Sequence, residues 1–344
     1  MEMNATAESW SNTSDKNSSQ PRFYRNDYVY LFEVGYYALL SCGAVLNIMV
    51  VFVMVRSGKI RQNISSFLIF HLSVTHLLLH LTVPIFWNIH YLKGNSSSCK
   101  VLVFIDYACA ATIFNSLVAI AWDRHRNVLR PFASLAPRRL KTYFKLVASI
   151  WMYALVTSVP FIYSVRTDTE VICSKENNAT ETCKEYSFCD LPSDWKTQLS
   201  KTIYFLLTFV IPLMYMFLVY TKIAVCLWKR SKHGAIHGAV AKCGKVKSTR
   251  LMVVAVLGFG LCWGPTFWVD LLNVYGAESE TNFELQIWCY LAQISSSCLN
   301  PAIYAFFSPE FRKLVSKFCC CCCTRRCFSR CRCHSYENQV QPAM

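Results

Sequence analysis

Residues 249–274 read TRLMVVAVLGFGLCWGPTFWVDLLNV. Apart from Arg250 near its start and Asp270 near its end, this stretch carries no charged side chain. A helix of roughly 20 apolar residues is long enough to cross the hydrocarbon core of a membrane. The proline at position 265 is compatible with such a helix, because neighbouring helices and waters satisfy the backbone groups that it frees. The stretch therefore predicts a transmembrane helix.

Six further stretches of the chain are similarly long and apolar. They cover residues 28–55, 66–91, 99–124, 143–165, 199–227 and 284–307. Seven crossings leave the two ends of the chain on opposite sides of the membrane. We therefore expect an all-α membrane protein, with a bundle of seven transmembrane helices over residues 28–307.

The composition agrees with this expectation. Hydrophobic residues make up 54% of the chain and charged residues only 16%, whereas soluble domains carry about 25% charged residues. The net charge of +15 could indicate nucleic-acid binding. However, the basic residues gather in alternate loops between the apolar stretches, and acidic residues gather in the others. The positive-inside rule then places the basic loops and the C-terminus in the cytoplasm and the N-terminus outside, in the plasma membrane.

Glycosylation sequons support the same orientation. Five Asn-x-Ser/Thr sequons lie on the predicted outer side, at Asn4, Asn12, Asn17, Asn95 and Asn178. A sixth, at Asn63, lies on the predicted inner side and is expected to be unused. Residues 1–27 are polar and predict a disordered, glycosylated extracellular tail.

The segment after the seventh span predicts attachment to the inner membrane surface. Residues 308–318 predict a short amphipathic helix, with apolar and basic side chains on different faces. The tail at 319–344 is rich in cysteine and begins with Cys319, Cys320, Cys321, Cys322 and Cys323. Cysteines beside basic residues near a membrane favour palmitoylation. A metal cluster is the alternative, but the spacing does not match a zinc motif, so we expect no metal and no cofactor.

Short motifs recur inside successive spans. The third span ends in Asp123-Arg124-His125, and the fifth carries Pro212 and Tyr220. The sixth carries Phe259 and then Cys262-Trp263-Gly264-Pro265, and the seventh carries Asn300-Pro301-Ala302-Ile303-Tyr304. In this order and spacing, residues 28–318 resemble the class A, rhodopsin-like family of G-protein-coupled receptors. The resemblance is to its peptide receptors.

The resemblance implies a signalling mechanism rather than enzyme activity. In the family, the arginine matching Arg124 swings to meet a heterotrimeric G protein, supported by the tyrosines matching Tyr220 and Tyr304. Pro265 kinks the sixth helix, so that its inner end can move outward. Trp263, one turn from Phe259, can pass the pressure of a ligand along the helix. Arrestin and receptor kinases are further expected partners. A receptor that takes up ligand without signalling remains an alternative.

The resemblance also implies a disulfide between Cys99 and the second outer loop, which contains Cys173, Cys183 and Cys189. Cys183 is the favoured partner, and Cys189 is the alternative. Cys173 could then pair with Cys189 within the loop. Residues 169–175 and 182–188 predict a β-hairpin there.

Asp106, seven residues into the third span from Cys99, is the central candidate for ligand binding. A carboxylate at this depth must be paired, solvated or available to a cation, and we expect no basic partner in the outer halves of the other spans. The residues expected around it are Phe86, Trp87, Phe267, Asp270, Glu284, Trp288 and Gln293. Acids and aromatic rings together favour a basic ligand. We expect a basic peptide, and an amine bound by Asp106 is the alternative.

The second span departs from the family pattern. His76 replaces the aspartate that anchors a sodium ion in the family, and Ile113 replaces a serine that helps it. An imidazole offers sodium neither charge nor a hard oxygen, so no sodium site is expected. We expect His76 to bond Asn300 or Ser297 instead, so that acid pH could alter activity; a satisfied core histidine is the alternative.

Two smaller departures lie near the cytoplasm. His125 replaces a tyrosine in the arginine motif. The sixth helix begins with Lys245 and Lys247 rather than with an acid that could clamp Arg124, which predicts some basal activity.

Overall fold

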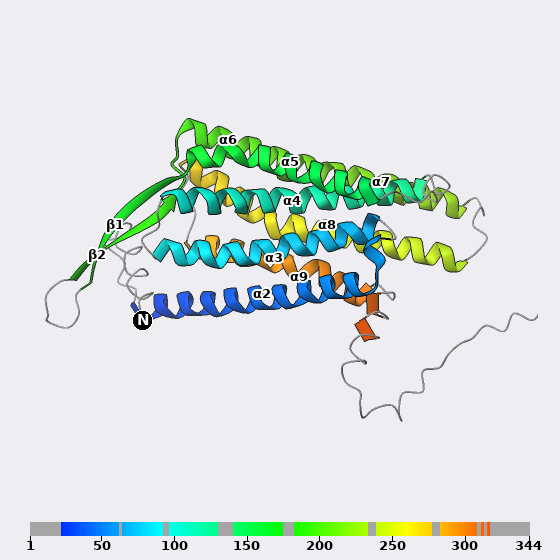
Figure 1. The fold of residues 1–344 in the computed structure, drawn as a ribbon, viewed down its shortest axis with the longest axis horizontal. Helices are drawn as coiled ribbons and strands as arrows, with labels where there is room; N and C mark the ends of the chain where they lie inside the picture. Colours follow the sequence, from blue (N-terminus) through cyan, green and yellow to red (C-terminus); the bar gives the residue numbers. More distant parts are fainter. Residues whose placement is uncertain are drawn as a thin grey trace, which may run out of the picture.

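A computed structural model describes the backbone of residues 22–61, 64–91, 96–129, 140–174, 182–232, 239–276, 283–307, 311–312 and 315–316, and most of their side chains. Long helices dominate it (Figure 1). They are α2 (Arg22–Arg56), α3 (Ile64–Tyr91), α4 (Ser96–Leu129), α5 (Leu140–Ser164), α6 (Trp195–Phe205), α7 (Ile211–Lys232), α8 (Ala239–Val274) and α9 (Phe283–Phe307). A short 3-10 turn, η1 (Lys59–Arg61), follows α2.

Each predicted span coincides with one of these helices or, for 199–227, with the run from α6 to α7; only the span 143–165 ends one residue beyond its helix. Within the described residues, α2, α3, α4, α5, the continuous run from α6 to α7, and α8 are long and apolar enough to cross a membrane. The seventh predicted span, 284–307, coincides with α9, which packs between α2 and α8. The predicted fold class, a seven-helix transmembrane bundle, is confirmed.

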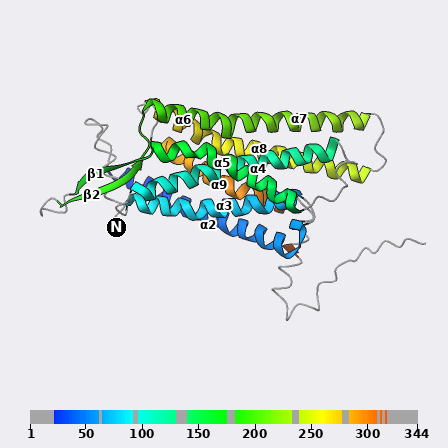
Figure 2. The ribbon, with the colours of Figure 1, turned by 45° about the horizontal axis from the view of Figure 1, so that its top comes forward.

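Helix α4 is the central helix of the bundle. It packs against α3, α5 and α7 and touches α8, and Figures 1 and 2 show it surrounded by the others. Cys109, Ile113 and Phe114 on this helix have no exposed surface. The outward faces of the helices instead expose large apolar side chains, as expected for contact with lipid: Val45, Leu81, Val156, Phe217 and Leu261.

The fifth span changes its hydrogen bonding half-way along. Between α6 and α7 lies one π-helical turn, η3 (Leu206–Val210), in which the Ile211 N–H donates to the Leu206 carbonyl. In the same pattern the Leu207 carbonyl would need residue 212 as its donor, but proline has no N–H. The Tyr153 hydroxyl of α5 donates to that carbonyl at 3.0 Å. The cross-helix bond therefore compensates for Pro212.

A two-stranded antiparallel hairpin projects from one end of the bundle (Figures 1 and 2). Strand β1 (Arg166–Ser174) pairs with β2 (Thr182–Asp190), with Arg166 opposite Asp190 and Ser174 opposite Thr182. The hairpin was predicted, although it begins three residues earlier than expected and ends two residues later. We call this end of the molecule the hairpin end.

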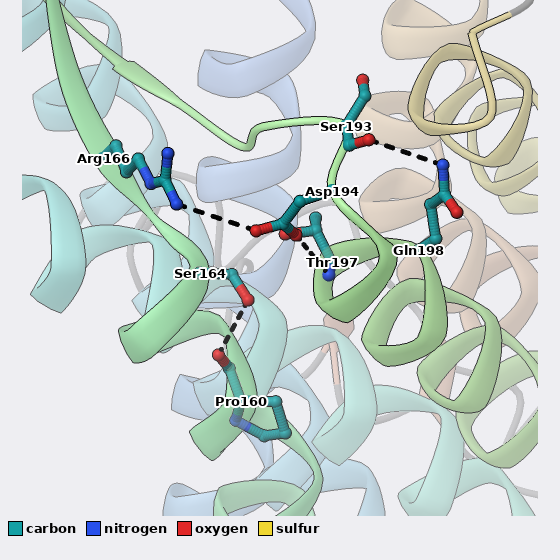
Figure 3. Close-up of polar contacts among 7 residues, drawn as sticks. All are labelled: Pro160, Ser164, Arg166, Ser193, Asp194, Thr197 and Gln198. Atoms are coloured by element: carbon teal, nitrogen blue, oxygen red, sulfur yellow. Dashed lines mark hydrogen bonds and ion pairs between the residues drawn. The ribbon is translucent and has the colours of Figure 1, made fainter.

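The base of the hairpin is tied to the start of α6 (Figure 3). Asp194 caps this helix by accepting a hydrogen bond from the Thr197 N–H at 2.8 Å, and Arg166 Nη2 lies 3.7 Å from its Oδ2. The backbone and side-chain hydrogen bonds from Thr197, with a smaller effect of Arg166, hold the pKa of the Asp194 carboxyl below its ordinary value.

Helices α2, α3 and α9 meet at a glycine. Asn47 Nδ2 donates to the carbonyl oxygens of Gly43, at 2.8 Å, and of Ser297, at 3.0 Å. A Cβ atom at Gly43 would collide with Ser297 Oγ and with His80 Nε2. This close approach therefore requires a residue without a side chain.

Gly43→Ala should lower the melting temperature of the purified protein, because overpacking a buried contact costs about 1–3 kcal/mol. Gly35→Ala is the matched control on the same helix, since its Cβ would meet only Leu291 at 3.9 Å. Equal melting temperatures for the two variants would contradict the close packing at Gly43.

Asp194→Ala should lower the melting temperature more than Asp194→Asn, because an asparagine oxygen still caps a helix. The depressed pKa of Asp194 means that its charge stabilises the fold above the unfolded pKa of about 3.9, and that this is lost as the pH falls through the folded value. The gap between wild type and Asp194→Asn should therefore close in melting curves recorded at increasingly acid pH below 4. A gap that does not change with pH argues against a role for the charge.

Candidate functional site

Two acids lie on inward faces of different helices at the hairpin end. Asp106 on α4 lies three residues from each of two buried neighbours, Val103 and Cys109, so it shares their face of the helix. Asp270 on α8 likewise shares a face with the buried Phe267. The two carboxyl groups are close enough for their charges to interact. The structure thus brings these two predicted ligand-binding residues together.

A lysine also belongs to this group. Lys201 on α6 lies four residues after Thr197 and three before Tyr204, which are 0% and 3% exposed, and its charge interacts with that of Asp270. The expectation of no basic residue in the outer halves of the other spans is therefore wrong. Lys201 was missed because it stands near the start of its span, where a lysine is commonly a membrane-surface anchor.

Phe267 forms part of the floor beneath the acids. Its side chain is only 8% exposed, and its ring centroid lies 5.1 Å from that of Phe209, 5.9 Å from that of Trp263 and 6.1 Å from that of Tyr204. Phe267 is therefore packed among other rings and exposes little surface of its own to a ligand.

The other predicted pocket residues divide into two groups. Gln293 is partly buried and lies four residues before Ser297, on the same face of α9. Trp288 is 63% exposed; it lies nine residues before Ser297, which places it on the opposite side of the helix. Trp288 therefore faces away from the bundle interior, contrary to expectation. The side chains of Phe86, Trp87 and Glu284 lie outside the described residues.

A continuous series of ring contacts leads from this floor toward the middle of the bundle. Phe114 on α4 lies 5.5 Å from Trp263 and 6.5 Å from Phe259 between ring centroids, and Phe259 lies 6.0 Å from His76. Trp263 Nε1 donates to Ser296 Oγ at 2.9 Å. Phe114 thus links Trp263 to Phe259, the two residues that the sequence predicted to lie near each other. No sequence motif distinguished Phe114 from an ordinary apolar residue.

The polar centre around His76 is arranged differently from the prediction. Among the described residues, neither ring nitrogen of the fully buried His76 has a hydrogen-bond partner. His80 Nε2 instead lies 3.2 Å from Ser297 Oγ, and its Nδ1 lies 2.6 Å from the His76 carbonyl oxygen. The expected bond from His76 to Asn300 or Ser297 is therefore wrong. His80, one helical turn from His76, comes close to Ser297 instead, because Gly43 has no side chain to block it.

A third histidine on α3, His71, has a structural role. His71 Nε2 accepts a hydrogen bond from Trp151 Nε1 at 2.9 Å, and its Nδ1 lies 3.2 Å from Ser116 Oγ. The imidazole therefore ties α3 to α4 and α5 through partners that the described structure already supplies.

At the opposite end, Asp123 is 2% exposed. Its Oδ2 accepts hydrogen bonds from Ser65 Oγ at 2.6 Å and from Asn127 Nδ2 at 3.0 Å. Arg124 Nε is buried and, within the described residues, has no hydrogen-bond partner. The Asp123 carboxylate is thus bonded by two neutral groups beside the arginine, a sharing that the sequence motif did not predict.

The remaining switch residues are described unevenly. Tyr220 is 6% exposed and Asn300 2% exposed, and His125 is partly buried. Pro265 and Pro301 lie inside α8 and α9. The side chains of Tyr304, Lys245 and Lys247 lie outside the described residues.

Cys99 is disulfide-bonded and 1% exposed. The strand register places Cys173 opposite Cys183, and Cys189 opposite Thr167, but the side chains of the three loop cysteines lie outside the described residues. The five sequon asparagines and Cys319 to Cys323 also lie outside them. Of the predicted surface helix, residues 311, 312, 315 and 316 are described, and they are helical.

Comparison with known proteins identifies the family. Residues 46–304 match the family described as "7 transmembrane receptor (rhodopsin family)". The chain belongs to the rhodopsin family of seven-transmembrane receptors. Members of this family are signalling receptors and not enzymes.

Several similar receptors are named after peptides. The allatostatin-A receptor of Bombyx mori is 29% identical over 80% of this chain and 75% of its own length. The neuropeptide Y receptor type 6 of Mus musculus is 24% identical over 86% and 81%, and the neuropeptide Y receptor type 1 of Xenopus laevis is 27% identical over 84% and 81%. Among class A receptors, this one is thus similar to receptors for peptides.

Because His76 stands where the family carries an aspartate, we predict that sodium does not change the potency of agonists at this receptor. Replacing sodium by a large organic cation should leave agonist potency in wild type unchanged, because no described carboxylate lies beside His76 to hold the ion. His76→Asp combined with Ile113→Ser should become sodium-sensitive, whereas Ile113→Ser alone, the matched control, should not. Equal sodium sensitivity of wild type and the double variant would refute the prediction.

Proposed function

We propose that this receptor binds a basic peptide at its hairpin end and in response activates a heterotrimeric G protein. The observation that carries the proposal is the placement of Asp106 and Asp270 on inward faces of α4 and α8 at the same end of the bundle. A buried carboxylate inside a membrane protein is costly unless it has a partner. A cationic group of a ligand would provide that partner.

A peptide fits the surroundings better than a small amine. The relatives with the names given above are receptors for allatostatin-A and neuropeptide Y. The inner surface of α6 beside Asp106 presents Tyr204 and Phe205, which are engaged in ring contacts with Phe267, rather than the row of serines typical of amine receptors. The projecting hairpin adds a surface beyond the bundle that a small amine would not need (Figure 1).

Activation would pass through the ring series already described. A ligand that presses on Phe267 displaces Trp263 and Phe114, and Phe114 contacts Phe259, which precedes Pro265 in α8. Well-packed rings have discrete arrangements, so a ligand can shift the balance between two packings. Outward movement of the opposite end of α8 would then uncover Arg124 for the G protein.

The remaining features complete the proposal. The hairpin end and the glycosylated N-terminus face outside, the C-terminus lies in the cytoplasm, and Cys319 to Cys323 carry palmitate. Cys99 pairs with Cys183 in the second outer loop. Arrestin and receptor kinases bind the cytoplasmic side. The basic loops on that side support this orientation.

Asp106→Asn should weaken activation by basic, C-terminally amidated peptides by about 30-fold or more, because it removes the charged partner of the ligand. The measurement is a dose–response curve with a promiscuous G-protein readout, beginning with neuropeptide Y and allatostatin-A peptides. Lys196→Gln, an exposed change at the same end, is the control and should leave the curve unchanged.

Arg124→Ala separates signalling from uptake. It should leave binding of the active peptide intact and abolish signalling. Signalling that survives in Arg124→Ala would contradict the proposed coupling. Binding by a wild-type receptor that never signals would favour the uptake alternative.

A further inference from the structure

Lys201 occupies a position where a charge needs an explanation. It shares the buried face of α6 with Thr197 and Tyr204, inside a helix that crosses the membrane. A cation facing the interior of such a bundle is retained only where it is paired or solvated. Lys196, by contrast, lies over the exposed ring of Trp195, 5.8 Å from its centroid, on the outer surface. The two lysines of α6 therefore lie in different environments: Lys196 on the outer surface and Lys201 on the buried face.

A hydrogen bond between helices fixes where Lys201 faces. Gln198 Nε2 of α6 donates to the Val274 carbonyl oxygen of α8 at 3.2 Å. Gln198 lies three residues before Lys201, and Val274 lies four residues after Asp270. Because residues three or four apart lie on one side of a helix, Lys201 and Asp270 face each other one turn deeper than this bond.

A second hydrogen bond places Asp106 at the same level. The Tyr204 hydroxyl of α6 donates to the Tyr107 carbonyl oxygen of α4 at 2.6 Å. Tyr204 lies three residues after Lys201, and Tyr107 directly follows Asp106. The two cross-helix bonds thus hold α4, α6 and α8 at a fixed spacing around the lysine and the two acids.

The charges within this group are unequally matched. Lys201 is close enough to Asp270 for their opposite charges to attract each other, whereas the charge that acts on Asp106 is the like charge of Asp270. Among the described residues, one cation therefore faces two carboxylates. With both carboxyl groups ionised, the group is therefore one positive charge short of neutrality.

We propose that Lys201 is the internal counter-ion of Asp270 and leaves Asp106 as the one carboxylate available to a ligand, so that the site selects ligands that insert a single cationic group. A second cation on the inserted part of the ligand would meet the ammonium of Lys201 and be repelled. Lys201 is thus a specificity-determining residue. The selectivity rests on the proposed function, but the Lys201–Asp270 pair does not.

The pair is tested without any ligand by a double-variant cycle on the purified full-length receptor. Lys201→Gln and Asp270→Asn should each change the melting temperature, and the double variant should differ from the sum of the two changes by about 3 °C. Lys196→Gln combined with Asp270→Asn is the control and should be additive. Additive changes for Lys201 and Asp270 would overturn the proposal.

The selectivity is tested with two probes that share one scaffold. Benzylamine carries one ammonium, and m-xylylenediamine carries a second on the same ring. In wild type, benzylamine should raise the melting temperature at lower concentrations than the diamine. In Lys201→Gln the ratio of the two half-maximal concentrations should shift about tenfold toward the diamine. An unchanged ratio, or no stabilisation by either probe in both proteins, would overturn the selectivity.

The two sets of results separate this inference from the proposed function. If no basic peptide activates the receptor, the peptide proposal fails while the ligand-free coupling of Lys201 and Asp270 still stands. If peptides activate through Asp106 but the cycle is additive, the inference fails while the peptide proposal stands.

Discussion

The hydrocarbon core of the membrane contains no water, so each polar group within it must find its partner inside the protein. This constraint explains the main irregularities of the bundle. The Leu207 carbonyl, left without a donor because of Pro212, accepts a bond from Tyr153 of the neighbouring helix. Asn47 bonds two backbone carbonyls, one of them on α9. Because lipid tails provide no hydrogen-bond partners, these polar groups bond to neighbouring helices and so hold the helices together.

The same constraint separates the charges into two groups. Asp106, Asp270 and Lys201 lie at the hairpin end, and Asp123 and Arg124 lie at the other. Between them, the described helices bury rings and histidines but no acid, lysine or arginine. In the mechanism that we propose, communication between the two ends depends on the packing of rings such as Phe114 and Phe259. Close-packed rings change arrangement in discrete steps, which would suit a receptor with two states.

The centre of the bundle is the place where this receptor differs from the family pattern. We propose that imidazole groups stand here in place of a carboxylate with a sodium ion; one of them, His80, contacts Ser297 where Gly43 allows close approach. The ring nitrogens of His76 and the Asn300 amide nitrogen remain without described hydrogen-bond partners. Buried polar atoms of this kind are costly, and the motifs around them did not predict this packing.

The amino-acid sequence by itself determined the seven spans, the loop hairpin and the switch motifs, because each depends on local apolar length or on residues close together along one helix. Pro265 and the pair Asp123-Arg124 were recognisable for that reason. Only the tertiary structure decided which side chains meet across helices. Trp288 was expected in the pocket but faces away from the interior, because its position around α9 depends on how that helix packs between α2 and α8. Lys201, Phe114 and His80 gained their partners in the same way, since a contact between helices depends on the rotation and depth of both, which neither sequence segment specifies alone.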